Sequence, residues 1–376
     1  MYQLNFNVGE FLQHYWQKKP VVIKQAFKDF SDPITAEELA GLACEEEIAS
    51  RVIVTEDNQW QIISGPIEDY SPYGEQNWQL LVQAVNHWFP DSIPLVEAFR
   101  FIPDWRFDDL MVSYATPGGG VGPHIDNYDV FLLQGSGSRH WKVGDIGEYR
   151  ARNGDSHTAL IDDFEPMLEV VLEQGDMLYI PPGYPHCAKT LTTALSYSIG
   201  FRAPSQQELF SSLADHLIDQ NSGLTRFTST SEPETPSLIS DEHQSDLKAM
   251  LCQLLESQDT MQPILGQLLS QNRFELDVCP PEQSYTIAEL REALEQGARL
   301  CRCGGLKIIE LENDPLNRLF IDGQTFQLPP HLSQQRRVLS ENINLSRQQT
   351  NLLLEEPEIA TLIIELINTG YLYLSE

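Results

Sequence analysis

Apolar residues between positions 109 and 201 fall into short runs that are separated by turn residues. Runs rich in β-branched and aromatic side chains predict strands at 110–114, 130–134, 140–143, 169–173, 177–180 and 194–201. Many short strands in succession are typical of an antiparallel barrel or jelly roll. We therefore expect a β-rich core in this part of the chain.

The residues before this core mix helix and strand. Residues 8–18 predict a helix that ends before Pro20. Val21 to Ile23 predict a short strand, because β-branched residues after a proline favour an extended chain. We assign these elements and the β-rich core to one domain, residues 1–204.

The apolar spacing becomes helical after Pro204, and we assign residues 205–272 to a helical region. Apolar residues recur three and four positions apart at Leu209, Phe210, Leu213, Leu217, Leu247, Met250, Leu251, Leu254, Leu255, Leu265, Leu268 and Leu269. A segment rich in Ser, Thr, Glu and Pro, residues 225–240, predicts a loop within this region. Such a stripe faces either a core or a second subunit, and the pattern leaves both open.

Residues 273–376 are predicted to form a small α+β unit. The pattern predicts a helix at 284–297, strands at 306–311 and 319–328 and a helix from Pro357 to Gly370, with a last strand after it. This order resembles a winged helix. Winged helices often bind DNA, but residues 281–376 carry 14 acidic and 8 basic side chains, so we expect no direct nucleic-acid binding.

The composition narrows the class of protein. The 376 residues carry 55 acidic and 24 basic side chains, a net charge of -31 that repels nucleic acid and is compatible with a basic protein partner. Six scattered cysteines make no disulfide framework. The amino terminus lacks the pattern of a secretory signal, and no apolar run approaches a membrane span. We expect a cytoplasmic protein that does not bind a membrane.

A candidate metal site stands out among the turns. His124 and Asp126 are two positions apart and therefore point to the same side of a strand, and His186 follows a second strand and a proline turn. Two histidines and one carboxylate that leave open positions are diagnostic of non-haem iron(II) oxygenases. The alternative is a surface ion pair beside a turn histidine, because a His-x-acid triplet alone arises by chance in a chain this acidic.

Arg139 and Ser113 suggest a binding site for a dicarboxylate. Alternation along the strand places Arg139 on the same face as Trp141 and Val143, so its guanidinium is expected to point inward, where it needs a carboxylate partner. A salt bridge within the protein is the alternative. Ser113 lies on the core-facing side of its own strand and either binds the same carboxylate or bonds to the backbone.

These residues resemble those of a known family. The segments 101–144, 174–186 and 10–24 are similar to the bacterial ribosomal oxygenases, JmjC-like cupin proteins that hydroxylate an arginine of large-subunit ribosomal protein L-sixteen. The resemblance implies iron(II) ligation by His124, Asp126 and His186. It also implies binding of the co-substrate 2-oxoglutarate by Arg139 and Ser113.

The resemblance also implies the whole architecture. It is an α+β fold in which a double-stranded β-helix, or jelly roll, of the cupin and JmjC type is followed by a helical dimerisation region and a winged-helix-like domain. We expect an iron(II)- and 2-oxoglutarate-dependent hydroxylase that forms a homodimer. The alternative is a non-catalytic, metal-stabilised cupin scaffold that binds a basic protein. The sequence does not identify the substrate-pocket residues or the task of the winged-helix-like domain.

Overall fold

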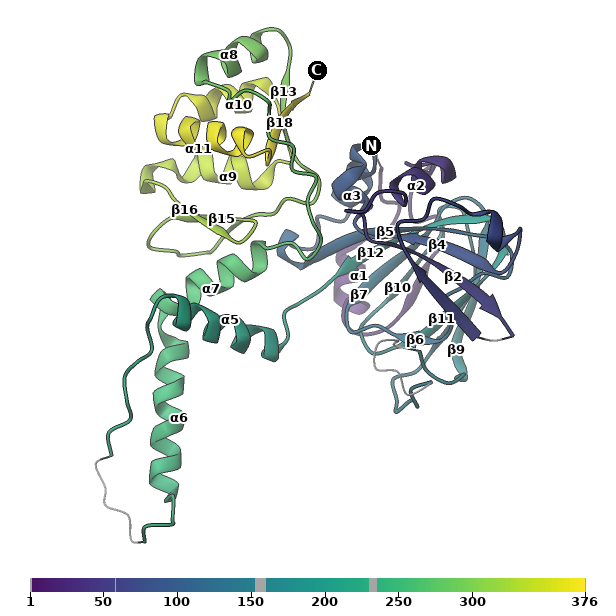
Figure 1. Cartoon of the computed structure of the whole chain (residues 1–376), viewed down its shortest axis with the longest axis horizontal. Coiled ribbons are helices and arrows are strands. Elements are labelled where there is room, and N and C mark those ends of the chain that lie inside the picture. The colour runs from purple at the N-terminus through teal and green to yellow at the C-terminus, as the bar shows by residue number, and fades with distance from the viewer. Residues whose placement is uncertain (1, 58, 153–159, 230–234, 376) are drawn as a thin grey trace.

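Two antiparallel sheets form the core of the first two hundred residues (Figure 1). The computed structural model describes residues 2–57, 59–152, 160–229 and 235–375. The larger sheet has the order β1-β10-β7-β12-β5-β4-β2-β3, and the smaller sheet has the order β6-β11-β8-β9. Val130 and Leu132 of the larger sheet pack with Trp141 and Val143 of the smaller one, so the two sheets face each other as a jelly roll.

The strands of the larger sheet are β1 (Val21–Ile23), β2 (Ser50–Glu56), β3 (Gln59–Ser64), β4 (Trp78–Val82), β5 (Phe107–Ala115), β7 (Asp129–Gln134), β10 (Met177–Ile180) and β12 (Ala194–Phe201). Those of the smaller sheet are β6 (His124–Ile125), β8 (Ser138–Gly144), β9 (Pro166–Glu173) and β11 (Pro185–Thr192). All six strands predicted between 109 and 201 are confirmed. The strands β2, β3, β4, β6 and β11 were not predicted.

Helices cover the outer face of the larger sheet. They are α1 (Val8–His14), α2 (Ala36–Leu42), α3 (Val85–Trp88) and α4 (Ile93–Glu97), with short 3-10 turns at Ser71–Tyr73, Pro90–Ser92 and Asp104–Arg106. The helix predicted at 8–18 ends earlier, because the chain turns at Gln17, whose φ is 55°. Each helix contributes at least one apolar side chain to the core beneath this face, as Phe11 and Leu39 do.

The helical region consists of α5 (Gln206–Asp219), α6 (Asp241–Glu256) and α7 (Gln258–Ser270). The apolar stripe predicted across 247–269 is therefore divided between two helices at Ser257. No residue of α6 is buried, and this helix extends away from the rest of the protein (Figure 1). No helix in the described part of the chain has both the length and the apolar character needed to cross a membrane.

The C-terminal unit contains two small sheets, β17-β13-β18 and β14-β15-β16, around which its helices pack. Its elements are α8 (Ile287–Glu295), β13 (Arg299–Arg302), β14 (Ile308–Glu310), β15 (Arg318–Ile321), β16 (Gln324–Gln327), a 3-10 turn (Pro330–Leu332), α9 (Ser333–Glu341), β17 (Asn344–Leu345), α10 (Arg347–Leu354), α11 (Pro357–Asn368) and β18 (Leu372–Ser375). The predicted helices, hairpin and last strand are confirmed, whereas α9, α10, β13 and β17 were not predicted.

Candidate active site

Paired strands of the smaller sheet bring the three candidate metal ligands together. His124 in β6 lies directly opposite His186 in β11, and Asp126 follows β6 immediately. As predicted, His186 follows a strand, β10, and the proline turn, and it lies near the start of β11. Side chains directly opposite in an antiparallel pair are close neighbours, which explains why residues sixty positions apart can share one ion.

The geometry of the three side chains suits one metal ion. Asp126 Oδ2 lies 3.8 Å from His124 Nε2 and 3.5 Å from His186 Nε2, and one ligand atom from each residue fits within 4.8 Å of the others. No other group of this kind is found among the described residues. The side chains of His124, Asp126 and His186 are 18%, 19% and 2% exposed, which argues against a surface ion pair.

Both histidines are held in the form that a metal needs. His124 Nδ1 lies 2.9 Å from the carbonyl oxygen of Gly122, and His186 Nδ1 lies 3.0 Å from that of Tyr184. A carbonyl oxygen only accepts hydrogen bonds, so Nδ1 donates its proton and Nε2 keeps a free lone pair. The two lone pairs therefore point to the side of the sheet on which Asp126 lies.

The charges of the site also favour a cation. Burial and, after it, the neighbouring His186 lower the pKa of His124 to about 4, so this imidazole is neutral at physiological pH. Burial alone would raise the pKa of Asp126, but its interactions with His186 and His124 outweigh burial and hold that pKa at about 2. One carboxylate and two imidazoles form a donor set for a divalent transition metal.

A cavity of about 420 Å³ extends from these ligands between the two sheets. Arg139 lines it from β8 with only 5% of its surface exposed, on the inward face predicted from the alternation with Trp141 and Val143. Its Nε and one terminal nitrogen have no hydrogen-bond partner, and burial lowers its pKa to about 10. No carboxylate among the described residues pairs with it, so the alternative of a salt bridge within the protein is not seen there.

Two further polar groups line the same cavity. Ser113 of β5 is 3% exposed, and its hydroxyl lies 3.1 Å from the hydroxyl of Ser196 and 3.5 Å from the carbonyl oxygen of the same residue. Gln79 of β4 is 1% exposed, and its amide nitrogen has no partner. Unpaired buried donors cost free energy unless a ligand satisfies them. An orphan guanidinium beside an amide and a hydroxyl therefore fits the distal carboxylate of 2-oxoglutarate, while its keto-acid end would reach the metal.

A second cavity continues the first on the other side of Met111. Met111, Tyr128 and Ser198 line both, and Asp109 lines the second one. Asp109 is 6% exposed, and burial, with the charge of Asp108 beside it, raises its pKa to about 7. A buried carboxylate of this kind is suited to a cationic side chain that enters from the metal.

The glycine-rich turn before β6 is a tightly packed bend. A Cβ at Gly119 would lie 2.3 Å from the carbonyl oxygen of Trp78, and one at Gly120 would lie 2.2 Å from that of Ala188. At Gly122, whose φ is +86°, it would meet the ring of Trp60 at 2.7 Å. Only glycine fits these positions, and the close contacts indicate a rigid bend that directs the chain into β6.

The sequence did not point to Gln79 or Asp109. Asp109 could have been found by extending the cavity-facing series of Met111 and Ser113 by one more alternate position. Gln79 was missed because β4, which is buried along its whole length, was not recognised as a strand.

Comparisons with known proteins agree with this site. A family model described as a JmjC domain matches residues 94–209, and one described as a ROXA-like winged helix matches residues 242–373. The chain is 41% identical over 374 residues to the ribosomal protein uL16 3-hydroxylase of Escherichia coli, with 98% of each chain covered. It is 32% identical over 333 residues to a probable ribosomal oxygenase of Haemophilus influenzae, which covers 84% of this chain and 80% of that one.

A solved structure is similar over the whole length. It is that of YcfD, a ribosomal oxygenase from Escherichia coli, in complex with cobalt and 2-oxoglutarate. The TM-score is 0.91 at 39% identity, and all of both chains is covered. The predicted fold class, a JmjC-type jelly roll followed by a helical region and a winged-helix-like domain, is confirmed.

Proposed function

The chain belongs to the ribosomal oxygenase family, and from this premise we propose that it hydroxylates ribosomal protein uL16 with iron(II) and 2-oxoglutarate. The family and the class of reaction, a 2-oxoglutarate-dependent dioxygenase reaction, are those expected from the sequence. The metal and the co-substrate would supply the oxidation, in which one atom of dioxygen enters a substrate C–H bond and the other enters succinate as carbon dioxide leaves.

The protein's own residues would position the reactants. Nε2 of His124, Nε2 of His186 and the carboxylate of Asp126 would hold iron(II), a donor set that suits non-haem iron oxygenases. Arg139 would bind the distal carboxylate of 2-oxoglutarate, and the Ser113 hydroxyl would donate to the same group. Apolar walls that include Trp141 and Val130 would exclude water from the cavity.

The reacting side chain is proposed to be an arginine of uL16. A guanidinium carries a fixed positive charge and forms paired hydrogen bonds with a carboxylate. Asp109, buried in the second cavity, offers that carboxylate beyond the metal ligands. The hydroxyl of Ser198 and the side chain of Met111 lie along the way, and the aliphatic carbons of the substrate would pass the open side of the iron.

The observation that best supports this proposal is the unpaired, buried guanidinium of Arg139, because a non-catalytic scaffold has no need of an unpaired cation beside its metal. His124→Ala should abolish succinate formation and uL16 hydroxylation while circular dichroism shows a folded chain. His140→Ala is the matched control, because His140 lies on the outer face of β8 and pairs with Glu169. Retention of activity by His124→Ala would favour the scaffold.

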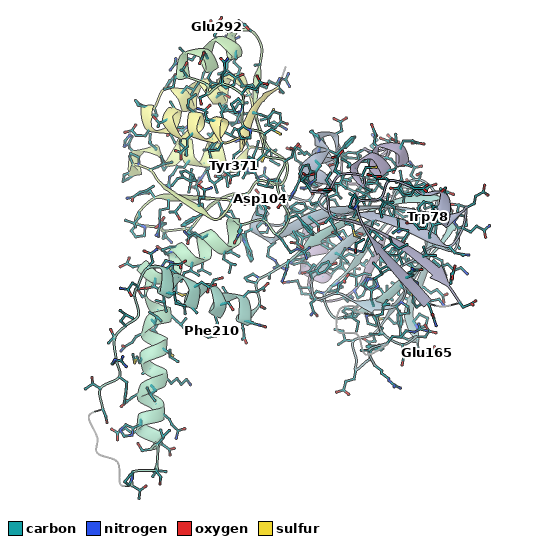
Figure 2. All side chains as sticks on the ribbon, in the orientation of Figure 1. Trp78, Asp104, Glu165, Phe210, Glu292 and Tyr371 are labelled. Atoms are coloured by element: carbon teal, nitrogen blue, oxygen red, sulfur yellow. The ribbon has the colours of Figure 1, made fainter. Side chains whose placement is uncertain are left out.

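We also propose that the chain forms a homodimer through its helical region, with the domain boundaries predicted from the sequence. Apolar side chains of α5 and α6 are largely exposed, as for Phe210 (60%) and Leu251 (63%). Figure 2 places Phe210 on α5, outside the two larger units. A two-fold partner would cover this apolar surface. The strongly acidic charge supports a basic protein substrate in the cytoplasm and no direct binding of nucleic acid.

A further inference from the structure

A short segment outside the jelly roll reaches the second cavity. Residues 271–286 connect α7 to α8 without regular structure. Arg273 and Phe274 of this segment line the cavity together with Asp109. Neither residue lines the first cavity, which contains the candidate metal ligands. Both therefore lie at the end of the second cavity that is remote from the metal. The pocket for the substrate side chain is therefore not built by the JmjC-type domain alone.

Contacts to both units hold this segment in place. The carbonyl oxygen of Glu275 lies 2.8 Å from Nδ1 of His87 in α3. The backbone N–H of Asn272 donates to Asp322 of the C-terminal unit at 3.3 Å, and Leu276 packs against the core of that unit. The segment is thus fixed between the domain that carries the metal site and the C-terminal unit.

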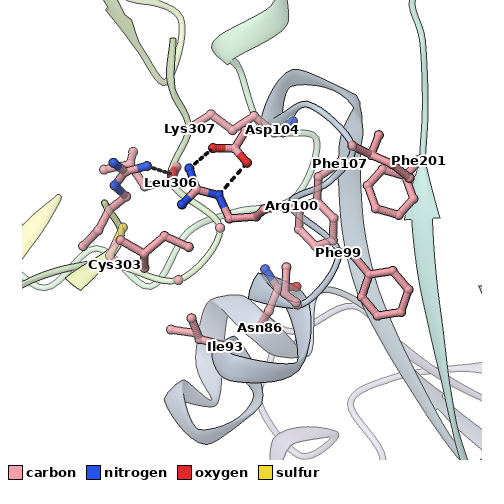
Figure 3. A pocket seen from close by; sticks show the side chains of 16 residues that line it. Asn86, Ile93, Phe99, Arg100, Asp104, Phe107, Phe201, Cys303, Leu306 and Lys307 are labelled. Atoms are coloured by element: carbon pink, nitrogen blue, oxygen red, sulfur yellow. Dashed lines mark hydrogen bonds and ion pairs between the residues drawn. The ribbon is translucent and has the colours of Figure 1, made fainter. Parts of the chain in front are cut away.

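Side chains of both units surround a small cavity of about 60 Å³ at their junction (Figure 3). Arg100 pairs with Asp104 at 2.7 Å and donates to the carbonyl oxygen of Glu341 at 2.6 Å. A Cβ at Gly304 would lie 1.9 Å from the carbonyl oxygen of Asn86. Such close approach of backbone to backbone leaves little freedom for the C-terminal unit to move against the jelly roll.

Arg273 contacts the strand that carries Asp109. Its guanidinium lies 2.6 Å from Asp108, whose side chain is 9% exposed, and stacks over the ring of Phe274 with its centre 4.4 Å from the ring centroid. Asp108 and Asp109 together oppose the single Gly200 of β12, which is a β-bulge. A bulge re-aims side chains beside active sites. Arg273 therefore fixes the bulge that points Asp109 into the cavity, and it holds Phe274 in place.

We propose that Arg273 and Phe274 form the far wall of the substrate pocket and limit the length of the side chain that it accepts. The inference rests on the proposed function, because it places the substrate guanidinium at Asp109. Phe274 closes the far end of the pocket, whereas Arg273 lines it beside Phe274 and is a positioning residue that acts through Asp108. The C-terminal unit thereby takes part in substrate selection, because it anchors the segment that carries both residues.

Side-chain length gives the test. The probes are a uL16 peptide that contains the hydroxylated arginine and the same peptide with homoarginine, which is longer by one methylene. One methylene changes kcat/KM by about 10- to 200-fold in a fitted pocket. Wild-type protein should prefer arginine by such a factor. Phe274→Ala should reduce the preference by about tenfold, and Phe274→Leu should reduce it less.

Arg273 is tested by separating KM from kcat. Arg273→Met should raise KM for the arginine peptide several-fold and leave kcat and KM for 2-oxoglutarate unchanged, whereas Arg273→Lys should restore most of the loss. Arg202→Met is the control, since Arg202 also forms an exposed ion pair, with Glu208, but does not line this cavity. Thermal melting of each variant shows that it folds.

The outcomes separate the two proposals. An unchanged preference for arginine in both Phe274 variants, while the wild-type protein hydroxylates the arginine peptide, overturns the wall and leaves the proposed function intact. A fall in kcat without a rise in KM for Arg273→Met overturns its positioning role. No hydroxylation of any arginine of uL16 by the wild-type protein overturns both proposals.

Discussion

Asp109 and Ser113 lie on the same cavity-facing side of β5, with Met111 between them as a wall common to both cavities. One strand therefore presents a carboxylate to one cavity and a hydroxyl to the other. A cationic side chain can pair with Asp109 in the second cavity, while an anionic co-substrate pairs with Arg139 in the first. The two ligands therefore do not compete for one site. The candidate metal ligands line the cavity on the Ser113 side of this wall.

Arg139→Met should separate co-substrate binding from folding. A hydrogen bond to a charged partner contributes ~1.5–3 kcal/mol, so KM for 2-oxoglutarate should rise about 100-fold. The free energy of unfolding of the ligand-free variant should not fall, because a buried guanidinium with unpaired nitrogens costs free energy. Steady-state kinetics and urea unfolding measure the two effects. A marked loss of stability would instead indicate a structural ion pair.

The ionisation of Asp109 should appear in the pH dependence of substrate binding. Its pKa is raised to about 7 by burial and by Asp108, and only the ionised form attracts a guanidinium. For wild-type protein, kcat/KM for uL16 should therefore rise between about pH 6 and pH 8 and then level off. Asp109→Asn should raise KM and remove this rise. An unchanged profile in the variant would exclude Asp109 as the partner of the substrate cation.

The same ionisation should affect stability in the opposite direction. Because the pKa of Asp109 in the folded chain lies above the ordinary carboxyl value, its favourable contribution is complete below about pH 4 and is lost as the pH rises through 7. The free energy of unfolding of Asp109→Asn relative to wild type should increase over this range, by at most ~1.4 kcal/mol per pH unit. Chemical unfolding at a series of pH values measures the difference.

The metal assignment predicts a steep loss of affinity when a ligand is removed. Loss of an outer hydrogen bond to a metal ligand costs about 10- to 100-fold in affinity, and loss of a ligand should cost more. His186→Ala should therefore weaken cobalt(II) binding by more than about 100-fold, measured by titration calorimetry. His140→Ala, on the outer face of the neighbouring strand, should bind cobalt(II) normally. Equal affinities for the two variants would place the metal elsewhere.

The proposed dimer depends on the exposed apolar face of the helical region. Leu251 of α6 is 63% exposed, and Leu247 one turn earlier is 42% exposed. Leu251→Glu should convert the protein to a monomer, measured by sedimentation equilibrium, because a charge at a subunit interface is costly when it is unpaired. Lys248→Glu is the control, since Lys248 is also on α6 but outside the apolar stripe. A monomeric wild-type protein would contradict the proposal.

The jelly roll was predictable where its strands are regular. Val130 to Leu133 are buried on both faces of the sheet, and such a continuous apolar run predicts a strand. The strand β3 was not, because its outer positions are exposed and its alternation is weak. The strand β11 begins at a proline turn and ends in threonines, so its local sequence resembles a loop, and its pairing with β8 and β6 holds it in the sheet.

The chemistry of the site was predictable only in part. His124 and Asp126 are two positions apart, and Arg139 alternates with Trp141 and Val143, so the side on which each of them lies follows from a period of two. That Gln79 and Asp109 face the same space depends on how distant strands pair, and the β-bulge opposite Gly200 is a feature that local sequence does not encode. Arg273 and Phe274 lie in a segment without regular structure, and their place at the cavity follows from the docking of the C-terminal unit.

Intact mass spectrometry of uL16 after incubation with the protein, iron(II), 2-oxoglutarate and dioxygen tests the central claim most directly. We expect a gain of one oxygen on an arginine side chain, with one succinate formed for each substrate molecule modified. We expect no gain with His124→Ala or without 2-oxoglutarate. An unmodified uL16, or the same modification by His124→Ala, would show that the protein is not this hydroxylase.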